Sequence, residues 1–143
     1  MAVRLRARRK FIATLESVMK QNPNHPGANH YYIHVMEASP HPEKALVCAE
    51  RLKGMMPAAG HLQHMPAHIM QRVGRYEDAA EANREGAAAD TAYYARAKPL
   101  DYYTMYTGHN YQYLALDSDG GPQSRDAGSR AQSTRDHPGR DAG

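Results

Sequence analysis

The chain is poor in cysteine and in the largest apolar side chains, because its 143 residues contain one Cys, one Phe and no Trp. The lone cysteine, Cys48, cannot form an internal disulfide, which is typical of proteins from reducing compartments. No apolar stretch approaches the roughly 18 residues that a membrane-spanning helix needs. No apolar segment follows the N-terminal arginines, as it would in a signal peptide. We therefore expect a cytoplasmic protein without a membrane span.

A strong charge imbalance is also missing. The formal net charge is +3 and the sequence pI is about 9.0, which is too mildly basic to indicate nucleic-acid binding by itself. A basic face on an N-terminal helix is usually solvated, so we do not expect a nucleic-acid partner. The basic residues that do cluster are Arg4, Arg6, Arg8, Arg9 and Lys10.

The pattern of apolar residues predicts an all-α protein, and no segment shows the alternation of a β-strand. Proline and glycine divide the chain into short helical segments. After residue 116 the composition changes, because residues 117–143 contain no Leu, Ile, Val, Phe or Met and cannot bury enough apolar surface to fold. We expect a helical domain over residues 1–116 and a flexible or non-native tail over 117–143. The expected helices cover about 8–20, 28–38, 42–55, 61–73, 75–90 and 101–116.

Several residues recur at a spacing of 34, which with two helices per unit is the period of tetratricopeptide repeats. In "VGRYEDA", residues 73–79, Gly74, Tyr76 and Ala79 resemble the Gly-x-Tyr-x-x-Ala junction between the two helices of that family's repeat. The resemblance covers about residues 8–116 and extends to a histidine-rich bacterial subfamily. The recurring pairs are Pro23 and Pro57, His30 and His64, His34 and His68, and Ala45 and Ala79.

This resemblance implies antiparallel helix pairs stacked as a short solenoid. The change of composition in the middle of a unit suggests that the repeat array is truncated. A solenoid without its capping repeat exposes an apolar end face. Self-association is one way to bury such a face, so we expect a homodimer.

The histidines fall at helical spacing in two places. His30, His34 and Glu37 lie at positions i, i+4 and i+7, so they share one helix face. A second stripe, at i, i+3 and i+7, consists of His61, His64 and His68. Stacking the two units at the 34-residue period predicts that His30 lies beside His64, and His34 beside His68. The resemblance implies that both stripes, extended by His109, line the concave groove where the family binds its ligands.

A concave surface lined by imidazoles predicts a divalent-metal site, and zinc is the metal that we expect. The predicted principal ligands are His30, His34, His64 and His68, with His61 and His109 as further ligands or supporting groups; two adjacent ions are also possible. Glu37 is either a ligand or the base that takes a proton from metal-bound water. A site left open to water would support hydrolysis of small esters or phosphoesters. The tyrosines expected to orient a histidine or a substrate are Tyr31, Tyr32, Tyr103 and Tyr106.

Two other functions fit the same residues. In the first, the groove is the peptide site of a protein-interaction module without catalysis, and the histidines contact the peptide. Alternatively, a closed metal site would serve a metal carrier or sensor without turnover. The sequence names neither the metal nor a substrate, so these alternatives stay open at this stage.

Overall fold

The computed structural model describes residues 2–97 and 103–118, and within these residues the protein is entirely helical. The all-α class predicted from the sequence is therefore confirmed for these residues. The helices are α1 (Ala2–Gln21), α2 (Pro26–Glu37), the 3₁₀ helix η1 (Pro42–Ala45), α3 (Leu46–Leu52), α4 (Gly60–Arg72), α5 (Tyr76–Tyr94) and α6 (Tyr103–Ser118).

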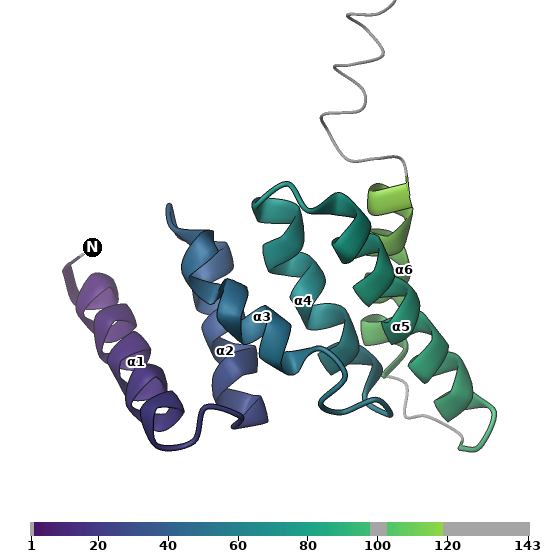
Figure 1. The fold of residues 1–143 in the computed structure, drawn as a ribbon, viewed down its shortest axis with the longest axis horizontal. Coiled ribbons are helices and arrows are strands. Elements are labelled where there is room, and N and C mark those ends of the chain that lie inside the picture. The colour runs from purple at the N-terminus through teal and green to yellow at the C-terminus, as the bar shows by residue number, and fades with distance from the viewer. Residues whose placement is uncertain (1, 98–102, 119–143) are drawn as a thin grey trace, which may run out of the picture.

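The helices follow one another in a row from α1 at one end to α6 at the other (Figure 1). Each α-helix packs against the next one along the chain, and in addition α2 packs against α4 and α4 against α6. The alternate helices α2, α4 and α6 therefore lie next to one another, and α4 is the middle member of this set. Every residue that later matters for the site comes from these three helices or from α5.

Local sequence signals explain where the helices begin and end. Pro26 occupies the first turn of α2, and the Nδ1 atom of His25 caps that helix by accepting a hydrogen bond from the backbone N–H of Ala28. Gly54 and Gly74 adopt positive φ angles of 70° and 81° in the turns after α3 and α4. A residue with a side chain is strained in this conformation, so both glycines terminate a helix at low cost.

All six expected helical segments are present, with differences at their ends. The first helix begins at Ala2 rather than near residue 8, because its N-terminal residues are mostly Ala, Leu and Arg, which are good helix formers. The segment from 42 to 55 is interrupted, since η1 precedes α3 and α3 already ends at Leu52. The fifth helix continues to Tyr94, and α6 ends at Ser118. The predicted tail beyond Ser118 lies outside the described residues.

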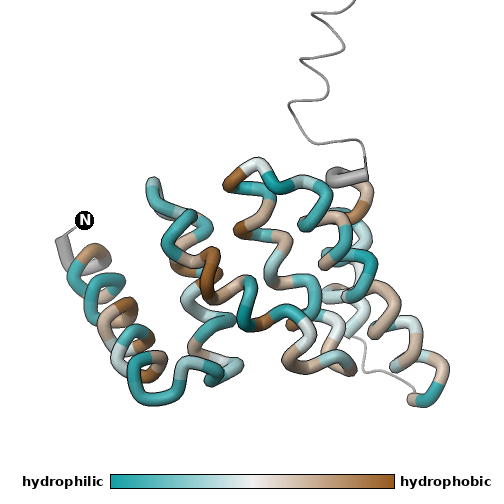
Figure 2. The backbone as a smooth tube through the Cα atoms, in the orientation of Figure 1, coloured by the Kyte–Doolittle hydropathy of each residue, from teal (hydrophilic) through white to brown (hydrophobic). Residues whose placement is uncertain are grey.

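The apolar core runs between the helices, with Ile33, Leu52, Met65 and Ile69 almost completely buried. Figure 2 shows hydrophobic and hydrophilic residues alternating along α1, as expected for a helix that buries one face only, whereas all residues of α4 from 63 to 70 are buried. None of the described helices is long and apolar enough to cross a membrane. Phe11 of α1 is not part of this core: its side chain is 43% exposed, and its ring lies 6.3 Å from that of Tyr31.

The close approach of α4 and α5 depends on two glycines. A Cβ atom added at Gly86 would lie 2.9 Å from the backbone oxygen of Gly60 and 3.1 Å from Cβ of His64. A Cβ atom added at Gly60 would in turn collide with the side chain of Asp90. Only glycine allows the two backbones to come this close, and the resulting contact places α5 directly behind the histidines of α4.

A buried carboxylate attaches α6 to α5. Asp90 of α5 is fully buried, and it accepts hydrogen bonds from the Tyr103 hydroxyl and from Nδ2 of Asn110, both at 2.8 Å. Both donors belong to α6, and Asn110 is also fully buried. These two bonds fix the rotation and height of α6, and thereby the position of His109, the neighbour of Asn110 in the chain.

Replacing Gly86 by alanine should destabilise the fold, although alanine is the better helix former by about 1 kcal/mol. The new methyl group meets backbone atoms of α4 that cannot move independently, and overpacking of this kind costs about 1–3 kcal/mol. The matched control is Gly108→Ala in α6, where nothing lies within 4 Å of the added Cβ. Urea unfolding should show a lower free energy of unfolding for Gly86→Ala and an unchanged or higher one for Gly108→Ala. Equal behaviour of the two variants would contradict the close-approach argument.

Candidate metal centre

Six histidines meet where α2, α4 and α6 adjoin. They form two groups of three, and within each group one ligand atom from every histidine lies within 4.8 Å of the others. Such groups could hold metal ions. The first group, here called triad 1, consists of His30 and His34 from α2 and His61 from α4. The second, triad 2, consists of His64 and His68 from α4 and His109 from α6.

The grouping differs from the four-histidine set predicted from the sequence. The rings of His34 and His68 are neighbours as predicted, with centroids 5.6 Å apart. His30, in contrast, contacts His61 rather than the predicted His64, and their Nε2 atoms are 3.2 Å apart. The ring of His34 also stacks on that of His61 at 6.1 Å. The helices α2 and α4 are therefore offset along their axes, because His34 lies between the levels of His61 and His68.

In triad 2, two hydrogen bonds determine which nitrogen carries the proton. Nδ1 of His64 lies 2.5 Å from Oδ1 of Asn83, and Nδ1 of His68 lies 2.8 Å from Oε1 of Glu37. An amide oxygen and a carboxylate oxygen can only accept. Both histidines must therefore donate from Nδ1, which leaves both Nε2 atoms without a proton when the rings are neutral. Hydrogen bonds of this type are how proteins orient histidine ligands towards metals.

The two Nε2 atoms that lack a proton face each other. Nε2 of His64 is 2.9 Å from Nε2 of His68, and Nε2 of His109 is 3.5 Å from the latter. Two neutral rings in these tautomers point lone pairs at one another, which is repulsive unless a cation lies between them. Nitrogen atoms bound to one tetrahedral zinc ion at the usual 2.0–2.1 Å would be about 3.3 Å apart. The observed separations lie close to this value.

Triad 1 is assembled differently. A contact between ring nitrogens joins His30 of α2 to His61 of α4. Nδ1 of His61 is buried and lacks a hydrogen-bond partner in the described part of the chain. A buried nitrogen without a partner is costly. Ligation of a metal ion is one way for a histidine to satisfy such a nitrogen.

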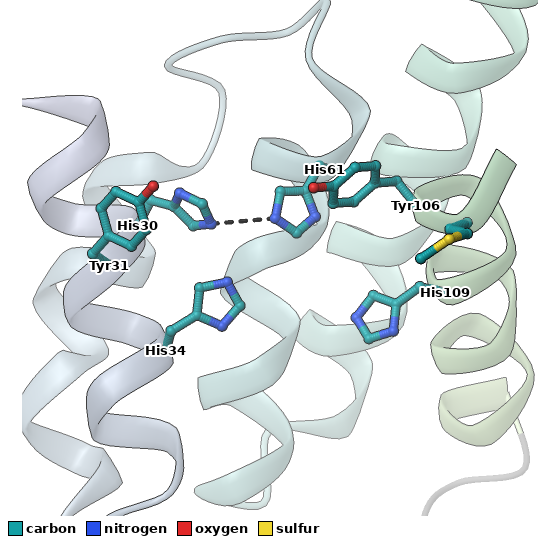
Figure 3. A pocket seen from close by; sticks show the side chains of 7 residues that line it. His30, Tyr31, His34, His61, Tyr106 and His109 are labelled. Atoms are coloured by element: carbon teal, nitrogen blue, oxygen red, sulfur yellow. Dashed lines mark hydrogen bonds between the residues drawn. The ribbon is translucent and has the colours of Figure 1, made fainter. Parts of the chain in front are cut away.

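Triad 1 opens onto a cavity of about 620 Å³. Figure 3 shows His30 and His34 of α2 on one side, His109 of α6 on the other, and His61 of α4 between them with the ring of Tyr106 beside it. Its lining residues are His30, Tyr31, His34, His61, Met105, Tyr106 and His109. A volume of this size admits a small organic molecule.

The environment favours the neutral form that metal ligation requires in five of these histidines. Burial, followed by repulsion from neighbouring histidines, lowers the pKa of His30 and of His61 to about 4. Burial and the proximity of His68 lower the pKa of His64 to about 3, against a smaller upward effect of Asn83. The same causes, burial first and then His68, lower the pKa values of His34 and His109.

Glu37, predicted as a ligand or base, forms a hydrogen bond with a histidine of triad 2. Burial works to raise the pKa of its carboxyl group, but the hydrogen bond from His68 and the nearby His68, His34 and His109 together lower it. Glu37 is therefore ionised at neutral pH and holds the proton on Nδ1 of His68. Its side chain remains 28% exposed, so the carboxylate also reaches solvent.

Of the four tyrosines expected at the site, Tyr31 and Tyr106 line the cavity. Tyr32 instead donates a hydrogen bond to Glu16 of α1, and Tyr103 binds Asp90, so these two predictions were wrong about the partner. The sequence reasoning missed Tyr113, whose ring lies 4.7–5.1 Å from His64, His68 and His109.

Asn83 was also missed, since it lies in an Ala-rich helix without any motif. The one available signal was its helical spacing from Gly86, at i and i+3 on the face of α5 that packs on α4. Cys48 is the single cysteine of the chain. Its thiol is buried in α3 with Sγ 3.5 Å from Sδ of Met19 in α1, and it belongs to neither triad.

No protein-family profile matches this chain, and no curated protein and no solved structure shows a significant similarity to it. The geometry of the two triads is therefore the basis on which a function is inferred.

Acid should destabilise the metal-free protein, because His64 is held neutral when folded. Its folded pKa of about 3 lies below its ordinary value of 6.5, so as the pH falls the unfolded chain binds protons first. The contribution of His64 is complete above the unfolded pKa and is lost as the pH falls towards the folded one. At about pH 5 this group alone lowers the free energy of unfolding by about 2 kcal/mol.

Urea unfolding at about pH 7.5 and about pH 5 measures this difference. The control is His64→Gln, which cannot titrate and should show a smaller pH dependence than the original protein. An identical pH dependence in the two proteins would contradict the assignment of a neutral, buried His64.

Proposed function

We propose that this protein binds zinc in a groove lined by histidines, with triad 1 and triad 2 as its two sites. The observation that carries this proposal is the pair of facing Nε2 atoms of His64 and His68, whose Nδ1 atoms are both committed as donors to Asn83 and Glu37. A bound cation would turn this repulsion into attraction. Protonation would relieve it too, but burial opposes a charge on His64.

Zinc suits the donor set better than the hard cations do. Imidazole nitrogen is a good ligand for Zn, Cu, Ni and Fe, whereas Mg and Ca prefer oxygen. Three histidines per ion leave one position of a tetrahedral zinc open for water or a substrate, which is the arrangement of catalytic rather than structural zinc sites.

We also assign the fold to the short solenoid of tetratricopeptide-like helix pairs that the sequence resembles. The 34-residue spacing supports this assignment, as does the direct packing of α2 on α4 and of α4 on α6. Gly74, with its φ of 81°, stands at the turn between α4 and α5 where the family's helix pairs carry a glycine. On this assignment α2, α4 and α6 are the first helices of successive pairs, whose inner faces line the groove.

Metal-assisted hydrolysis of small esters or phosphoesters is the activity that such a site would support. A zinc ion in an open site lowers the pKa of bound water to near 7 and so supplies hydroxide. Among the carboxylates in the described part of the chain, Glu37 is the one hydrogen-bonded to a triad histidine, and its partly exposed oxygens are the available proton acceptor. The cavity beside triad 1 would hold the organic part of the substrate.

Zinc content decides between this function and a metal-free peptide groove. We expect the untagged protein to retain one to two equivalents of zinc per chain in elemental analysis, and to take zinc up again after chelation. The variant His109→Ala, which removes a partly buried ligand, should bind less zinc. His41→Ala is the control, because His41 is 60% exposed in a turn outside both triads. No zinc in the original protein, before or after reconstitution, would overturn the proposal.

If the bound zinc is catalytic, the reconstituted protein should hydrolyse p-nitrophenyl acetate faster than its chelated form. With both sites saturated with zinc, Glu37→Gln should lower kcat with little effect on KM, since the amide fills the same space but cannot take a proton. General-base removal typically costs about 10²–10⁴-fold in rate. Zinc binding without any turnover would instead favour a metal carrier or sensor, the alternative with a closed coordination sphere.

A further inference from the structure

The two triads differ in burial. His64 and His68 of triad 2 are 0% and 4% exposed, and His109 is partly buried. In triad 1 none of the rings is fully buried, and His34 is exposed. An ion at triad 2 would therefore be surrounded by protein on most sides. At triad 1 it would keep direct access to the solvent of the cavity.

The two triads also differ in how their rings are held. Two rings of triad 2 are oriented by hydrogen bonds to residues outside the triad, Asn83 of α5 and Glu37 at the end of α2. In triad 1, by contrast, the buried Nδ1 of His61 has no partner in the described part of the chain. Ligands held in place before the ion arrives lose less conformational freedom on binding, and loss of such partners typically weakens a metal site 10–100-fold.

The two triads also differ in how many helices hold them in place. Triad 2 is built from α4 and α6 and braced by Glu37 of α2 and Asn83 of α5, so four helices fix its geometry. The bonds of Tyr103 and Asn110 to Asp90 hold α6, and hence His109, against α5. Triad 1 takes its three ligands from α2 and α4 only.

From these differences we propose that the groove contains two unlike metal sites: triad 2 is a tight, resident site, and triad 1 is a weaker site whose ion exchanges with solvent and accepts an external ligand. This inference rests on the proposed zinc binding. It adds which triad binds the ion more tightly and which triad accepts an external ligand.

The cavity beside triad 1 defines the class of that external ligand. Its lining residues are imidazoles, the rings of Tyr31 and Tyr106, and Met105, and none of them carries a permanent charge. A dianionic phosphate monoester would find no arginine or lysine among these lining residues. A small molecule with one metal-binding group, such as a carboxylate, ester carbonyl or hydroxamate, attached to an apolar or aromatic body fits this lining best.

Stepwise zinc titration of the metal-free protein tests the order of affinity. In competition with a chromophoric chelator, the original protein should take up two equivalents in two steps whose affinities differ at least about tenfold. His109→Ala should lose the tighter step and His34→Ala the weaker one. Both replaced side chains are at most partly buried, and circular dichroism checks that the helices are retained.

The variants that support triad 2 without being ligands give the sharper test. Glu37→Gln and Asn83→Ala should weaken the tighter step by about 10–100-fold and leave the weaker step unchanged. Two equal steps, or loss of the tighter step in His34→Ala with its retention in His109→Ala, would overturn the inference while leaving zinc binding intact. Absence of any uptake would instead overturn the proposed function itself.

Cobalt substitution with acetohydroxamic acid as the probe tests the division of roles. With one equivalent of Co²⁺, His109→Ala places the ion at triad 1, and acetohydroxamic acid should change its visible absorption. His34→Ala places the ion at triad 2, where the spectrum should not respond at the same concentration. A response in His34→Ala and none in His109→Ala would assign the open site to triad 2 and refute the proposal.

Discussion

The site depends on the 2.9 Å approach of Nε2 of His64 to Nε2 of His68. Residues four apart on a helix bring their side chains together, and two neutral imidazoles that meet in this way form a hydrogen bond only when one of them carries its proton on the inner nitrogen. Here the outer nitrogens are already used as donors, to an amide oxygen and to a carboxylate that can only accept. The protein has thus fixed both rings in the tautomer that leaves the inner nitrogens without a proton, and the proposed metal ion would bind to these two nitrogens.

The rest of the fold positions the groups that impose this tautomer. Asn83 reaches His64 because α5 lies unusually close to α4, and that approach requires glycine at 60 and 86. Glu37 reaches His68 because it ends α2, which packs directly on α4. His109 reaches the same point because Asp90 holds α6 on α5. The helix array is therefore the means by which partners far apart in the sequence act on two rings of one helix.

Much of this arrangement follows from the sequence, because helical spacing alone puts the histidines of one helix on one face. The helices, their breaks and the histidine faces were predicted for that reason. The division into two triads was not predictable, since it depends on the offset of α2 relative to α4, and the 34-residue period carries no information about that offset. The role of Asn83 as the partner of His64 could not be predicted either, because a single asparagine in an Ala-rich helix belongs to no recognisable motif.

The histidine cluster lowers the stability of the metal-free fold. His64 is fully buried in α4, as are Met65, Ala67 and Ile69 of the same helix, and an aliphatic side chain at its position would need no hydrogen-bond partners. Burying several imidazoles together lowers their pKa values and leaves nitrogens without partners, both of which cost free energy in the metal-free chain. A bound ion stabilises the folded state by an amount set by its concentration and affinity. Because the sites join α2 to α4 and α4 to α6, that stabilisation would act on the contacts that hold the array together. The cluster thus destabilises the metal-free fold, and a bound ion would stabilise it. Departures of this kind from good core packing are expected at functional sites.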